Sequence, residues 1–192
     1  SLRIDTTGQL QKNRLLTPHG QVGLAPAAIA NRAAQELEEA FQKFRAPTKT
    51  TLHLISRRDR HGHNSWMHNI TAMHPRGKHT NYLLIHPHDA GVRNLDATAI
   101  ARVTSPTGHV DLPIKLSEDL MAGTVALPHG WGHGGADGLR VAQQTAGVNV
   151  NRLAPTGPSA LEHHAGMARL NGIEVDVTRV PDHADLQPPE SA

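Results

Sequence analysis

The chain has 192 residues, enough for one domain with a sizeable core, and its net charge of +2 lacks the concentrated basic face of a nucleic-acid binder. It contains no cysteine, which excludes disulfides, thiolate nucleophiles and cysteine-ligated metal centres within these residues. We find no apolar run long enough to cross a membrane and no signal-peptide pattern. The absence of cysteine fits a reducing compartment, so we expect a cytoplasmic protein.

The first predicted element is an amphipathic helix that begins at Pro26, because proline suits the first turn of a helix. Apolar residues then recur at helical spacing, at Ile29, Ala33, Leu37, Ala40, Phe41 and Phe44. Pro47 ends the helix. We expect residues 1–48 to form an irregular lead-in and this helix, with its apolar stripe packed on the rest of the domain.

After Pro47 the pattern changes to short strands. They are predicted at Thr50–Ile55, Asn81–His86, Thr98–Thr104, His109–Leu116, Gly123–Leu127, Val148–Leu153 and Ile173–Val180. The third and fourth flank the turn sequence SPTG and should form a hairpin. Pro113, in the fourth, predicts an edge strand or a bulge. Many short strands with Gly-rich joints indicate a closed barrel over residues 49–180, followed by a frayed tail, 181–192.

The most informative stretch is LHLISRRDRHGHNSWMHN, residues 52–69, an apolar strand that ends in a polar loop. Its candidate ligand groups are Ser56, Arg57, Arg58, Arg60, His61, His63, Asn64, Ser65, Trp66, His68 and Asn69. Arginine presents a planar fork of donors that matches phosphate oxygens, while amides and the indole ring suit the edges and faces of heterocycles. The loop therefore suggests a large anionic cofactor with ring systems. The alternative is a solvated basic surface loop.

Two later segments add candidate contacts. Residues 128–147 are rich in Gly and His and predict a long loop, in which PHGWGHGG lets the backbone approach an anion or a ring closely. A flexible linker is the alternative, although Trp131 should dock somewhere. In GVNVNRL, residues 147–153, Asn149 and Asn151 fall on one side of an extended segment, where they would meet a heterocycle or cap turns.

Other chemistries find little support. His129 and His133 are separated by glycines and no HExxH motif occurs, so we predict no metal site despite the fifteen histidines. Ser65 has histidines near it but lies in no Gly-x-Ser-x-Gly elbow. Motifs of the P-loop and of the Rossmann fold are also missing. We therefore predict no catalytic residue.

Four segments in order resemble the C-terminal domain of the molybdopterin oxidoreductases related to dimethyl sulfoxide reductase and formate dehydrogenase. They are SRRDRHGHNSWMHN at 56–69, LLIHPHDA at 83–90, GTVALPHGWGH at 123–133 and GVNVNRLAP at 147–155. The resemblance covers roughly residues 50–180. It implies a mainly β fold, a six-stranded double-psi β-barrel with short helices. It also implies binding of bis-molybdopterin guanine dinucleotide that carries molybdenum or tungsten.

The resemblance also implies roles for single residues. The first segment would meet the pterin and phosphates through Ser56, Arg57, Arg58, Arg60, Asn64, Ser65, Trp66, His68 and Asn69. Asp89, with His86, would face a guanine edge, although many relatives carry Asn at position 86. The pterin would be approached by His129, Trp131, His133, Asn149 and Asn151. Relatives often have Gly-Asp where this chain has Leu95-Asp96. The resemblance therefore implies that Asp96 keeps the role of that Asp, and it leaves open the geometry of the turn before Asp96.

In this family the metal ligand and any iron–sulfur cysteines lie on an earlier domain. Because the sequence contains no such region, we expect an excised domain or a separate subunit of a molybdenum or tungsten oxidoreductase, inactive alone. Its partners would be the remaining domains or subunits, with neither nucleic acid nor membrane involved. The alternative is a standalone double-psi barrel used as a protein-interaction or substrate-recognition module. Loops that share one face would favour cofactor binding, and scattered loops would favour the module.

Overall fold

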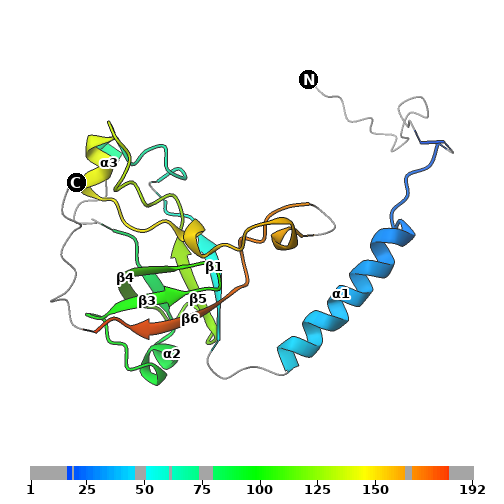
Figure 1. Ribbon diagram of the computed structural model, residues 1–192, viewed down its shortest axis with the longest axis horizontal. Helices are drawn as coiled ribbons and strands as arrows, with labels where there is room; N and C mark the ends of the chain where they lie inside the picture. The colour runs from blue at the N-terminus through cyan, green and yellow to red at the C-terminus, as the bar shows by residue number, and fades with distance from the viewer. Residues whose placement is uncertain are drawn as a thin grey trace. The chain divides into compact units, whose positions relative to one another are not determined.

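The chain divides into two units, Ser1–Pro47 and Thr48–Ala192, which are described separately. The computed structural model describes residues 17–18, 20–45, 51–60, 62–73, 80–162 and 166–181. The first unit contains helix α1, Ala27–Arg45, and the second contains six strands and short helices (Figure 1). His61 of the polar loop and the tail predicted beyond residue 181 lie outside the described residues.

Helix α1 confirms the predicted amphipathic helix. Its first turn is closed by the Pro26 carbonyl, which accepts hydrogen bonds from the next turn. Pairs four residues apart, such as Arg32 with Glu36 at 3.0 Å, run along its polar face. Leu37 and Phe41, from the apolar stripe, are exposed. The packing of this stripe on the barrel stays a prediction.

The six strands close a barrel in the order β1-β5-β2-β4-β3-β6, and β6 pairs back onto β1. The neighbours β1–β5 and β2–β4 are parallel, and the other neighbours are antiparallel. This closed, mainly β barrel confirms the predicted fold class (Figure 1). The strands are β1 Leu52–Arg57, β2 Leu83–Ile85, β3 Ile100–Thr104, β4 His109–Leu116, β5 Thr124–Pro128 and β6 Ile173–Arg179.

Alternating side chains fill the barrel interior. In β4, Val110, Leu112 and Ile114 are buried, while the residues between them face outward, as the period of two predicted. Other strands contribute Leu54, Leu83, Ile85, Val103, Leu127, Val175 and Val177. Burying each large aliphatic side chain contributes about 1.5–3 kcal/mol, so the aliphatic core is the main stabilising feature.

The edge position predicted for Pro113 is wrong. Strand β4 pairs with β3 through residues His109 to Pro113 and with β2 from Ile114 onward, so it lies inside a closed sheet. Pro113 stands at the point where the strand changes neighbour. A proline without a backbone N–H is tolerated there because the regular ladder to β3 ends at this residue.

The strand predicted at Val148–Leu153 is also wrong, because residues Val150–Leu153 form a 3₁₀ helix, η3. The Asn149 side chain accepts a hydrogen bond from the Asn151 N–H at 3.0 Å and starts this turn. Both ends of the turn, Val150 and Leu153, are buried, because residues three apart share a face of a 3₁₀ helix. Within the loop predicted at 128–147 lies a further short helix, α3, Arg140–Gln144.

The two ends of the barrel carry different elements. Because β1 and β5 are parallel, the segments that follow them, from Arg58 and from His129, leave from one end, called here the loop end. Strand β2 is antiparallel to β5, so helix α2, Pro87–Val92, lies at the opposite end, called here the helix end. Figure 1 shows α2 below the strands and α3 above them.

Candidate functional site

Glycines let three loops pack against one another at the loop end. Gly130 has a φ of 88°, and a Cβ there would lie 2.0 Å from the carbonyl oxygen of Asn64. A Cβ at Gly132 would lie 2.5 Å from the Cβ of Asn149. The close backbone approach predicted for the Gly-rich loop is therefore made to other loops of the chain. The loops joined in this way are residues 56–69, 128–135 and 147–153.

Asn81 is a buried connection between the second and third loops. Its Nδ2 donates to the carbonyls of Pro128 at 3.1 Å and Val148 at 3.0 Å, and its Oδ1 accepts from the Val148 N–H at 2.9 Å. In the sequence, Asn81 is predicted only as the start of a strand. The signal in the sequence was an Asn next to a buried apolar run, because an amide buried there needs several hydrogen-bond partners.

Aromatic rings join the first and second loops. The His68 and Trp131 rings are buried, with centroids 4.6 Å apart in an edge-to-face arrangement. The His133 ring lies 5.0 Å from that of His68, and its Nε2 donates to the Gly130 carbonyl at 2.8 Å. These predicted site residues therefore lie among the three loops. Trp131 packs against another ring, as expected for a large side chain in a glycine run.

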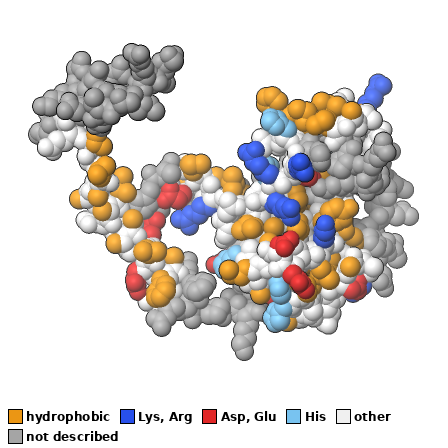
Figure 2. Space-filling model, turned by 180° about the vertical axis from the view of Figure 1, so that it is seen from behind, with side chains coloured by type: hydrophobic (Ala, Val, Ile, Leu, Met, Phe, Trp, Pro, Cys, Tyr) orange, Lys and Arg blue, Asp and Glu red, His pale blue; other side chains and the backbone are white. Residues whose placement is uncertain are grey.

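The solvent-facing part of the loop end carries cations. The side chains of Arg57, Arg58 and Arg60 are exposed, as is Trp66, which is 77% accessible. The Arg57 carbonyl accepts from the His129 N–H at 3.0 Å, so the first arginine is fixed to the second loop. Figure 2 shows basic side chains over the upper part of one face of the barrel, with hydrophobic groups along its upper edge. Ser65 is exposed in the same loop.

Three predicted residues form a chain of side-chain hydrogen bonds. The hydroxyl of Ser56 lies 3.0 Å from His129 Nδ1, and His129 Nε2 lies 3.1 Å from Asn64 Oδ1. The Ser56 N–H also donates to Asn171 Oδ1 at 2.7 Å. Sequence reasoning missed Asn171, which precedes β6 in an Asn-Gly pair typical of turns.

The remaining loop asparagines differ in what they contact. Asn69 Oδ1 accepts from the N–H groups of Val141 at 3.1 Å and Ala142 at 3.3 Å, and so caps helix α3 from another loop. Asn149 caps η3, which is the second of the two roles considered for it. The side chain of Asn151 is exposed. Two of these amides therefore hold the loops in place.

His86 and Asp89 lie at the helix end, away from the three loops. His86 caps α2 by accepting from the His88 N–H at 3.1 Å. The carboxylate of Asp89 is buried and accepts from the Gly123 N–H at 2.7 Å, which ties α2 to the residue before β5. The structure does not bring these two residues together with the others, and their guanine contact stays a prediction.

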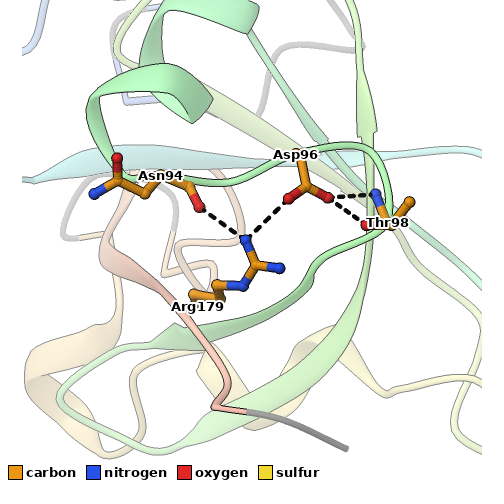
Figure 3. Close-up of polar contacts among 4 residues, drawn as sticks. All are labelled: Asn94, Asp96, Thr98 and Arg179. Atoms are coloured by element: carbon orange, nitrogen blue, oxygen red, sulfur yellow. Dashed lines mark hydrogen bonds and ion pairs between the residues drawn. The ribbon is translucent and has the colours of Figure 1, made fainter.

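The turn after α2 is held by polar contacts (Figure 3). Asn94 adopts a left-handed φ of 55°, and the Leu95 side chain that follows it is buried. Asp96 accepts from the Thr98 hydroxyl at 2.5 Å, and from the Thr98 N–H and Arg179 Nη1, each at 2.9 Å. These bonds lower the pKa of Asp96 to about 2, the Thr98 hydroxyl contributing most, followed by the Thr98 N–H and Arg179. Asn94 thus provides the turn conformation that was open in the sequence.

The part of the chain that the structure describes holds neither a candidate metal site nor a candidate membrane span. Among those residues, no three side chains of the His, Asp and Glu types are placed to hold a metal ion. No described helix has the length and apolar character needed to span a bilayer.

The chain is similar to known proteins over most of the barrel. A family model described as "Molydopterin dinucleotide binding domain" matches residues 52–172. One subunit of the tetrathionate reductase of Salmonella typhimurium is 29% identical over 133 residues, covering 59% of this chain and 13% of that protein. Acetylene hydratase from Pelobacter acetylenicus shares the fold, with a TM-score of 0.60 at 19% identity over 85% of this chain and 24% of that one. The chain thus spans a small part of each relative's length.

Proposed function

Because the chain belongs to the molydopterin dinucleotide-binding domain family, we propose that its loop end binds the pterin and diphosphate of bis-molybdopterin guanine dinucleotide. The observation that carries this proposal is the convergence of three donor-rich loops at one end of the barrel. Loops scattered over the surface would have favoured a protein-interaction module. Their convergence favours a single bound cofactor.

The side chains at the loop end fit such a group. Arg57, Arg58 and Arg60 are exposed cations close together in one loop, and guanidinium forks match the oxygens of a diphosphate. Trp66 offers an exposed ring in the same loop, suited to a flat heterocycle. The buried pair His68 and Trp131 supports this surface from below, so we propose that its role is to hold the contact residues in place.

We propose that the chain works as one domain of a molybdenum or tungsten oxidoreductase and is inactive alone. It spans 13% of the matched tetrathionate reductase protein and 24% of the acetylene hydratase, so its partners would be the remaining domains or subunits of the parent protein. The bound cofactor would supply the redox chemistry, and this chain would supply binding and orientation.

Inorganic pyrophosphate, the smallest model of the diphosphate, tests the proposal. As pyrophosphate is added to the chain, we expect the backbone amide NMR signals of residues in the three loops to shift. Arg58→Gln should weaken pyrophosphate binding by about tenfold, because it removes a charge-assisted hydrogen bond.

Lys115→Gln is the matched control. Lys115 is an exposed cation near the end of β4, at the helix end of the barrel, so its loss removes the same charge far from the loops. Because solvent screens distant charges, we expect at most about a twofold change. Equal losses in the two variants would indicate non-specific attraction, and the absence of any shift would overturn the diphosphate site.

A further inference from the structure

The placement of the Asn64 amide oxygen sets the direction of the hydrogen bonds that link Ser56, His129 and Asn64. An amide oxygen only accepts, so His129 Nε2, 3.1 Å from Asn64 Oδ1, carries the proton. In the neutral ring Nδ1 is then an acceptor, and the Ser56 hydroxyl, 3.0 Å away, donates to it. Because its oxygen is engaged, Asn64 has its Nδ2 amide group left for a ligand.

The backbone around Asn64 restricts its movement. Asn64 and the preceding His63 have positive φ angles of 61° and 42°. The carbonyl of Asn64 packs against Gly130, where even one added methyl carbon would overlap it. Rotating the amide by half a turn would set its NH₂ group against the N–H of His129, two donors face to face. With Nε2 protonated, His129 therefore favours the amide orientation in which Asn64 Oδ1 faces the ring.

We infer that His129 is a positioning residue, which holds the exposed Asn64 side chain with its NH₂ group available to an oxygen acceptor such as a phosphate. The Ser56 hydroxyl donates to Nδ1 of this tautomer, and Asn171 Oδ1, from the segment before β6, accepts from the Ser56 N–H. The ligand in this inference rests on the proposed function, whereas the hydrogen-bond direction does not. The loop end thereby presents the Asn64 NH₂ group as a donor to oxygen atoms of a ligand.

The direction of these bonds is measurable without any ligand. Long-range proton–nitrogen correlation NMR on the 192-residue chain, above the pH range in which histidine titrates, identifies which ring nitrogen of His129 is protonated. We expect the proton on Nε2. A proton on Nδ1, or an average of both tautomers, overturns the inference.

Two substitutions of His129 separate positioning from simple packing. In His129→Gln the amide nitrogen reaches the place of Nε2 and still donates to Asn64, whereas in His129→Asn only the place of Nδ1 is filled. We expect the Asn variant to bind pyrophosphate about tenfold more weakly than the wild type, and the Gln variant about threefold or less. Equal losses in the two variants contradict a positioning role.

Asn64→Gly provides a second variant that preserves the backbone, since glycine accepts a positive φ without strain. It removes the amide and should also weaken pyrophosphate binding by about tenfold. If the wild-type chain binds no pyrophosphate, the proposed diphosphate site fails, and the tautomer measurement still decides the direction of the bonds. If the wild type binds and both His129→Asn and Asn64→Gly bind pyrophosphate as tightly as the wild type, the positioning role fails and the diphosphate site stands.

Discussion

At the scale of the residue, Gly130 permits the close approach of the first two loops. It has a left-handed φ of 88° and lies directly against the Asn64 carbonyl, so it needs both the conformational freedom and the small volume of glycine. Gly138 has a similar φ of 83°, but nothing lies within 4 Å of the place where its Cβ would be. The two positions therefore separate backbone strain from steric overlap.

We expect Gly130→Ala to lower the free energy of unfolding by about 2–5 kcal/mol, from left-handed strain and overpacking together. Gly138→Ala should cost only the strain, about 1–2 kcal/mol. Urea unfolding of both variants measures the difference. Equal destabilisation would mean that the first loop moves away from Gly130 freely.

At the scale of the element, Asn81 decides where the second and third loops lie. One buried side chain satisfies two carbonyls and one N–H group, on the last residue of β5 and on Val148 ahead of η3. Asn81 lies two positions before β2 begins at Leu83. The loop end is therefore held from inside the protein as well as by the contacts at its surface.

Asn81→Ala should destabilise the chain by about 2–4 kcal/mol, because it leaves buried backbone groups without partners. Hydrogen exchange at the Val148 N–H should also become faster. Asn151→Ala, which removes an exposed amide from the same loop, is the control and should change stability by less than about 0.5 kcal/mol. Similar effects of both substitutions would argue against a buried connection.

At the scale of the whole molecule, two ion pairs stabilise the barrel, one within a hairpin and one between segments 83 residues apart. Arg102 and Asp111 meet across β3 and β4 through two hydrogen bonds of 2.8 and 2.7 Å. Arg179, at the end of β6, binds Asp96 in the turn after α2. The pKa of each carboxyl group is lowered, that of Asp111 chiefly by hydrogen bonding to Arg102. Both pairs should therefore lose their contribution to the free energy of unfolding as the pH falls into the acid range.

For Asp96 the pKa falls from 3.8 to about 2 on folding, so its contribution is present above pH 4 and is lost as the pH falls toward 2. Asp96→Asn removes this titration, so the variant should lose less stability than the wild type between pH 4 and pH 2. Thermal unfolding of both proteins at several pH values measures this loss. The stability difference between them at pH 7 is the baseline. Parallel curves for the two proteins would contradict the prediction.

Local patterns in the sequence determined helix α1, most strands of the barrel and the hairpin of β3 and β4, because side-chain periodicity depends only on near neighbours. They also identified the donor-rich segments, since residue chemistry is independent of the fold. Periodicity failed at η3, where alternating Asn and Val residues fit a strand but the Asn149 side chain starts a turn.

Only the tertiary structure decided which candidates meet. Ser56 and His129 are 73 residues apart and become neighbours because β1 and β5 pair in parallel. Asp89 lies at the opposite end because β2 runs antiparallel to β5. Strand order and direction follow from contacts made across the whole barrel, and no local pattern contains them.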